Sequence, residues 1–172
     1  MFDILQVVGV ILAVAAMVPA LAHALELPGK LRLAKEDYMA VQPIYYPGFT
    51  VMGFSEPGAI LAAIFLVFLA VPGSVDFWLT LAALAQLISM HAVYWLRTHP
   101  VTNFWLQDKK LGKAGTRFFS VGSEGENGTQ GVAGADWKDL RNQWEHSHVI
   151  RAVLAVVSFI ALLLACSSVT DV

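Results

Sequence analysis

Residues 4–25 of this chain read ILQVVGVILAVAAMVPALAHAL, a nearly continuous apolar run without Asp, Glu, Lys or Arg. Three further apolar runs follow, at residues 51–71, 77–96 and 149–166. A helix needs roughly 20 such residues to cross a hydrocarbon core about 30 Å thick. The sequence therefore predicts an all-α integral membrane protein, a four-helix bundle that forms a single membrane domain over residues 1–172.

The composition supports this prediction. Hydrophobic residues make up 57% of the chain and charged residues 14%, with a mean hydropathy of +0.63. These values are too apolar for a soluble domain of this length, so the lipid bilayer is the expected partner. No basic stripe interleaved with aromatic residues is present, so nucleic acid is not an expected partner. The single cysteine, Cys166, excludes an internal disulfide and a cysteine-based metal cluster.

The basic residues predict the orientation in the membrane. Four spans place the segments 26–50 and 97–148 on the same side, and these segments hold all of the 11 Lys and Arg residues except Arg151, which lies just inside the fourth span. The opposite side carries only acids, namely Asp3, Asp76 and Asp171. By the positive-inside rule both larger loops are cytoplasmic and both termini lie outside. We expect a bacterial inner-membrane protein with periplasmic termini.

The two larger connections have different compositions. In the first, Pro28-Gly29 is expected to end or kink the first span, and residues 31–41 should form an amphipathic helix at the membrane interface. The long loop 97–148 contains a glycine-rich part, 122–134, that is expected to be flexible. Asp136 is the predicted cap of a last helix over residues 137–163.

Polar side chains enter the apolar runs near their cytoplasmic ends. The histidines and glutamates concerned are His23, His91, His99, His146, His148, Glu26 and Glu56. In the last helix Arg141, Trp144, His148 and Arg151 follow one another at helical spacing, so they share a face. Ionisable groups at membrane depth are costly and by default mark functional sites. We therefore expect a polar cup between the four helices, open to the cytoplasm.

Structural roles compete with functional ones for these residues. The side chains expected to be solvated at the interface are Arg97, His99 and His146. Glu26 and Glu56 would pair with Arg141 or Arg151 and hold the helices together. A single interhelical hydrogen bond, worth about 1 kcal/mol, would account for a histidine such as His91.

No bound cofactor is expected. A di-iron bundle needs Glu-x-x-His on two helices and further carboxylates, whereas this chain has His23-x-x-Glu26 once and in reversed order. The alternative left open is one zinc, copper or iron ion bound by His23, Glu26, Glu56 and His91.

The sequence resembles the anthrone-oxygenase-like family of small four-span membrane proteins. The motif that carries the resemblance is Pro-x-x-Asn followed by Trp-x-x-x-His-x-x-Arg, here Pro100, Asn103, Trp144, His148 and Arg151. In number and spacing of spans the resemblance covers the whole chain. It implies oxidation of an apolar aromatic substrate such as an anthrone by molecular oxygen, without a tightly bound cofactor.

This resemblance gives the polar residues roles. The candidate catalytic residues are His148 as the base, Arg151 and Asn103 as partners of a substrate oxyanion, and His91. The candidate ligand-binding residues are His23, Glu26, Glu56, Tyr45, Tyr46, Trp95 and Trp144. The rival hypothesis is a non-enzymatic bundle that binds a lipid or quinone, or that forms a homo-oligomer or an accessory subunit of a larger membrane complex.

Overall fold

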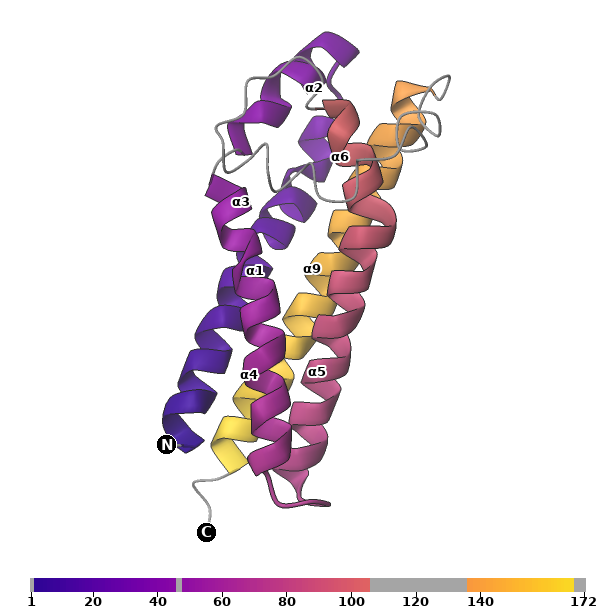
Figure 1. Ribbon diagram of the computed structural model, residues 1–172. Helices are drawn as coiled ribbons and strands as arrows, with labels where there is room; N and C mark the ends of the chain where they lie inside the picture. Colours follow the sequence, from indigo (N-terminus) through magenta and orange to yellow (C-terminus); the bar gives the residue numbers. More distant parts are fainter. Residues whose placement is uncertain (1, 46–47, 106–135, 169–172) are drawn as a thin grey trace.

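Four long helices lie side by side in the molecule, which is described here from a computed structural model that places residues 2–45, 48–105 and 136–168 (Figure 1). These helices are α1 (Phe2–Lys30), α4 (Ser55–Leu69), α5 (Val75–Val93) and α9 (Trp137–Ser168). Shorter elements lie between them, namely α2 (Lys35–Val41), the 3-10 helix η1 (Gln42–Tyr45), α3 (Gly48–Gly53), the π-helix η2 (Tyr94–Thr98) and α6 (His99–Trp105). Among the described residues, four helices are long and apolar enough to cross a membrane. The predicted all-α membrane bundle is confirmed.

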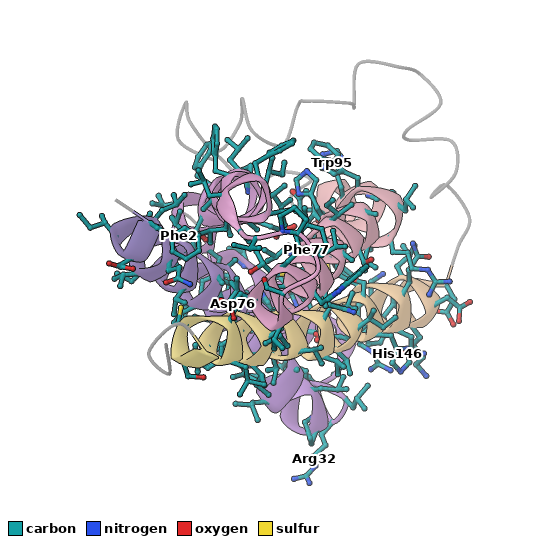
Figure 2. All side chains as sticks on the ribbon, turned by 90° about the horizontal axis from the view of Figure 1, so that it is seen from below. Phe2, Arg32, Asp76, Phe77, Trp95 and His146 are labelled. Carbon is teal, nitrogen blue, oxygen red and sulfur yellow. The ribbon has the colours of Figure 1, made fainter. Side chains whose placement is uncertain are left out.

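The outside of the bundle is apolar, as a lipid-facing surface requires. Large side chains such as Phe68, Leu96 and Ile4 are 82%, 75% and 70% exposed. Viewed from the end that holds Phe2 and Asp76, side chains project outward all round the helices (Figure 2). Helix α1 begins and α9 ends at this same end, whereas α2 and α6 lie at the other (Figure 1).

Helix α1 continues past the point where the sequence analysis expected it to stop. Pro19 and Pro28 both lie inside it, and it ends at Lys30. A proline lacks the N–H for its own helical bond, but the ladder resumes with the Leu31 N–H donating to the Leu27 carbonyl at 3.0 Å. Of the two outcomes predicted for Pro28-Gly29, the end of the helix was wrong, and the kink stays a prediction. The interfacial helix α2 is correspondingly shorter than predicted and begins at Lys35.

The second and third spans also differ from their predicted limits. The second is divided at Phe54 between α3 and α4, and Pro57 lies in the first turn of α4, where a missing N–H costs nothing. The third does not end at Leu96, because α5 passes through the π-helical turn η2 directly into α6. Within η2 the N–H of His99 donates to the carbonyl of Tyr94, five residues earlier.

Helix α9 begins at Trp137, as predicted, and extends beyond residue 163 to Ser168. The Asp136 carboxylate accepts a hydrogen bond from the N–H of Lys138 at 3.1 Å, which confirms the predicted cap. The glycine-rich part 122–134 lies outside the described residues.

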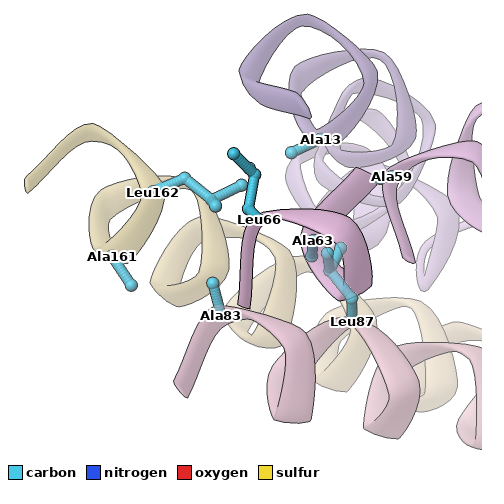
Figure 3. Close-up of a cluster of buried hydrophobic side chains, with 8 residues drawn as sticks. All are labelled: Ala13, Ala59, Ala63, Leu66, Ala83, Leu87, Ala161 and Leu162. Carbon is cyan, nitrogen blue, oxygen red and sulfur yellow. The ribbon is translucent and has the colours of Figure 1, made fainter. Parts of the chain in front are cut away.

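Three apolar clusters follow one another along the bundle. The first, at the end with the termini, contains mostly alanine and leucine: Ala13, Ala59, Ala63, Leu66, Ala83, Leu87, Ala161 and Leu162 (Figure 3). The second includes Ala16, Met90 and Ala152, and the third, near α2 and α6, includes Tyr38, Trp105 and Trp144. Small residues let helix backbones approach closely in a membrane, where lipid is as apolar as leucine. The candidate site lies between the second and third clusters.

Candidate functional site

A cavity of about 280 Å³ lies within the bundle and is bounded by residues of all four long helices and of the short elements near them. Its volume is close to the lower limit for small-molecule sites, roughly 300–1,000 Å³. The sequence-predicted site residues in its wall are His23, Tyr45, Glu56, His91, Trp95, Trp144, His148 and Arg151.

Three predicted site residues are not among the described residues of this wall. Glu26 lies on α1 outside the cavity, where it accepts a hydrogen bond from the Tyr45 hydroxyl at 2.5 Å. Tyr46 and the side chain of Asn103 lie outside the described residues. The roles assigned to all of these residues remain predictions.

Buried Glu56 is the centre of a network that joins three helices. One carboxylate oxygen accepts from the Arg151 guanidinium at 2.6 Å, and the other lies 3.0 Å from Nδ1 of His91. Trp95 Nε1 donates to Nε2 of His91 at 3.0 Å. Because an indole N–H can only donate, Nε2 of His91 must accept, and its proton must sit on Nδ1. His91 is therefore neutral, and Arg151 alone balances the charge of Glu56.

A second buried network surrounds Lys30, which is 4% exposed. Its ammonium lies 2.8 Å from Nδ1 of His23, 3.1 Å from Glu26 and 3.4 Å from Glu145. Three N–H donors thus meet three acceptors. The ammonium also lies over the rings of Tyr45 and Trp144, at 4.7 and 5.4 Å from their centroids.

Two tyrosines outside the spans complete this network. The hydroxyl of Tyr38 donates to Glu145 at 2.8 Å, as that of Tyr45 donates to Glu26. Burial raises the pKa of both tyrosines well above the ordinary value, and the hydrogen-bonded carboxylates raise it further. Both phenols therefore stay protonated and remain donors.

His148 is a buried residue of the cavity wall that takes part in neither network. It is 5% exposed, and neither ring nitrogen has a hydrogen-bond partner among the described residues. Its ring centroid lies 4.2 Å from that of His23 and 4.3 Å from that of Trp144. Buried imidazole nitrogens are ordinarily paired. A bound molecule in the adjoining cavity would supply the missing partner.

The candidate metal ligands are divided between these networks. His23 and Glu26 contact Lys30, whereas Glu56 and His91 contact one another and Arg151 or Trp95. Among the described residues, no three His, Cys, Asp or Glu side chains are arranged as ligands of one ion. The expectation that the site works without a cofactor stays a prediction.

Of the residues expected to be solvated, His146 and Arg97 are exposed, and Figure 2 shows His146 pointing away from the bundle. His99 is buried instead, with its ring 4.8 Å from that of Trp95. That prediction was wrong because it placed the end of the third helix at Leu96, whereas the helix continues through His99.

Sequence analysis also missed wall and network residues, namely Lys30, Tyr38, Tyr94, Thr98 and Glu145. A signal for one of them was present. Lys30 lies seven residues after His23 and four after Glu26, which is one helix face if the helix passes Pro28. Ending the helix at Pro28-Gly29 concealed that face.

Comparison with known proteins gives one result. No curated protein and no solved structure matches the chain. The family described as anthrone oxygenase matches residues 44–161, more than half of the chain, including Glu56, His91, His148 and Arg151. The protein therefore belongs to the anthrone oxygenase family.

Proposed function

We propose that this protein uses molecular oxygen to oxidise an acidic C–H position of a planar, apolar aromatic molecule, with His148 as the general base. The observation that carries the proposal is the buried imidazole of His148, whose two nitrogens have no partner among the described residues. A base must reach the proton that it removes, and His148 lines the cavity in which a substrate would lie.

The chemistry requires little beyond a base and a site that favours an anion. His148 removes a proton from a substrate methylene and leaves a carbanion conjugated with the aromatic system. The carbanion transfers electrons to oxygen and forms a peroxide anion at that carbon, and the proton held by His148 converts it to a hydroperoxide. Loss of water then gives a carbonyl group, with one oxygen atom in the product and the other in water. No electron donor other than the substrate is consumed.

The charges near the cavity support this sequence of steps. Arg151 lines the cavity, and its Nε has no hydrogen-bond partner among the described residues although another of its nitrogens binds Glu56. Its guanidinium also lies 5.1 Å from the ring centroid of Tyr94. Since the charge of Arg151 is balanced by Glu56, its contribution is the Nε–H, a fixed donor in a low-dielectric site that stabilises developing negative charge. In our proposal Arg151 and Asn103 stabilise the substrate oxyanion.

The remaining wall supports the proposed substrate class. Aromatic rings of Tyr45, Phe49, Trp95 and Trp144 surround the space, which suits a flat apolar molecule. Such a molecule concentrates in the bilayer. By the positive-inside rule the end with α2 and α6 faces the cytoplasm, so in our proposal the site lies near the cytoplasmic leaflet.

Binding of a quinone without turnover is the second candidate function. His148 offers an N–H that would donate to a quinone carbonyl, and the same rings would hold the ligand. In this case the protein would act as a carrier or as a subunit of a larger complex. Turnover separates the two candidates, because both predict binding.

The test uses purified protein in lipid nanodiscs with anthrone as the probe substrate. Oxygen consumption and anthraquinone formation should depend on the wild-type protein and stop under nitrogen. His148→Gln should lose this activity. The matched control is His146→Gln, two residues away on the same helix and exposed, which should keep it. Tight binding of anthraquinone by a protein that never oxidises anthrone would support the quinone-binding alternative instead.

A further inference from the structure

We infer that Lys30 is a positioning residue that fixes His23 as a permanent hydrogen-bond donor to the ligand, while His148 beside it stays free to take a proton. The division of roles rests on the proposed function of His148. The tautomer assigned to His23 does not depend on that proposed function. Lys30 and His23 both lie on α1, before residue 44, where the match to the anthrone oxygenase family begins.

The assignment follows from the contact between Lys30 and His23. The ammonium nitrogen lies 2.8 Å from Nδ1, and the two residues are 4% and 2% exposed, so water does not compete. An ammonium group has only donors, so Nδ1 must accept. A neutral imidazole that accepts at Nδ1 carries its proton at Nε2. His23 lines the cavity, so the Nε2–H is its available donor for a ligand there.

The surroundings of Lys30 keep this arrangement in place. Glu26 and Glu145 lie 3.1 and 3.4 Å from the ammonium and attract it from two sides. Glu145 is itself held by the Tyr38 hydroxyl at 2.8 Å. The ammonium is therefore held from several sides and has little freedom to turn away from His23.

The two histidines are neighbours with opposite constraints. Their rings lie 4.2 Å apart at an interplanar angle of 38°, and both line the cavity. His23 has one nitrogen occupied by Lys30, whereas His148 has neither nitrogen occupied among the described residues. His23 therefore cannot take a proton at Nδ1 without losing Lys30, and its Nε2 already carries one. When His148 removes a proton, the negative charge that spreads to a substrate carbonyl oxygen would meet the Nε2–H of His23.

Nitrogen-15 NMR of histidine-labelled protein in nanodiscs tests the tautomer directly, with the His23 signal assigned by its loss in His23→Gln. We expect only the Nε2–H form of His23 in the wild-type protein and in Lys30→Arg, since arginine is also a pure donor. Lys30→Met should give a mixture of both tautomers. The matched control is Lys35→Met, an exposed lysine at the start of α2, which should keep the wild-type signal.

The wild-type spectrum alone can overturn the inference, because an Nδ1–H form of His23 contradicts it. An unchanged spectrum in Lys30→Met would also do so. Since Lys30→Met leaves Glu145 without its ammonium, the double variant Lys30→Met with Glu145→Gln removes the stranded charge if the single variant does not fold.

A binding measurement tests the consequence for the ligand. Affinity for 1,8-dihydroxyanthraquinone, followed by its visible absorbance without turnover, should fall about tenfold in Lys30→Met and return in Lys30→Arg. Unchanged affinity would contradict a donor role for His23. If anthrone is never oxidised, the proposed function fails, while the tautomer and binding results still decide the role of Lys30.

Discussion

The two halves of this bundle are built in opposite ways. In the half that holds the termini, the core is the alanine and leucine cluster around Ala83 and Leu87, with buried Ser158 donating to the Ala83 carbonyl at 3.2 Å. In the other half, helices meet through Lys30, Glu56 and Arg151 around a cavity. Close packing of small residues needs no ligand. A half that buries charges and leaves space is suited to bind something, so stability and function should be separable by position.

The largest expected effect is on activity and arises in the polar half. His148→Gln should lower anthrone turnover by a factor of about 10²–10⁴, the usual contribution of a general base. The melting temperature of this variant in nanodiscs should be close to that of the wild type, because no hydrogen bond to the ring nitrogens is lost. Turnover is measured as anthraquinone formation. A large loss of stability with binding and turnover intact would make His148 a packing residue and remove the contrast between the halves.

Arg151→Met should have the largest effect on stability. It leaves the buried carboxylate of Glu56 without its 2.6 Å ion pair, and breaking a buried pair costs about 3–5 kcal/mol. Reversible unfolding in mixed detergent micelles would measure this cost. The double variant Arg151→Met with Glu56→Gln should recover most of it. If the single and double variants are equally unstable, Arg151 does not stabilise the protein by pairing with the charge of Glu56.

A substitution in the apolar half should lower stability and leave turnover unchanged. Ala83 is fully buried in the alanine and leucine cluster, so Ala83→Leu forces extra atoms into a packed core, at about 1–3 kcal/mol. Turnover at a temperature where the variant is folded should equal that of the wild type. The exposed residue Ile88, changed to Leu, is the control and should alter neither quantity. A selective loss of turnover in Ala83→Leu would show that the two halves are coupled.

The smallest expected effect comes from Tyr38→Phe, which removes the hydrogen bond to Glu145 and should cost about 1 kcal/mol. Burial raises the pKa of Tyr38, so the folded state keeps a proton that the unfolded state releases above about pH 10. That contribution to stability is complete below about pH 10 and is lost as the pH rises towards the folded-state pKa. The unfolding free energy of Tyr38→Phe should therefore fall less steeply above pH 10, whereas Trp137→Phe, nearby on α9, should keep the wild-type slope.

The apolar half was predictable from the sequence and much of the polar half was not. Four apolar runs of spanning length dictate a membrane bundle. In the polar half the start of α9 was predictable, because Asp136 before Trp137 marks it. The local rule that a proline ends a helix failed at Pro28, because Leu31 restores the ladder. Because of that error, Lys30 was not predicted as the partner of His23.

Pairings between residues far apart in the sequence could not be predicted either. Tyr38 and Glu145 are 107 positions apart, and nothing local in either segment specifies the other. Histidine at membrane depth indicated that a site existed, since polar groups there need partners. It did not indicate that His23 and His91 are paired whereas His148 is not, because that depends on how four helices are rotated against one another.

The π-helical turn η2 has a consequence for how this protein can change over evolutionary time. Its wide hydrogen bond, from the His99 N–H to Tyr94, accommodates one more residue than an α-helix would. Each residue turns an α-helix by about 100°. A deletion elsewhere in the span Val75–Thr102 would therefore rotate everything beyond it, whereas deleting one residue within Tyr94–Thr98 would turn the wide turn into a regular α-turn and keep α6 and Thr102 in place. The loss of a single codon at η2 would thus preserve the pocket, whereas the same loss within α5 would not, so this turn is the place in the third span where the length of the chain can change.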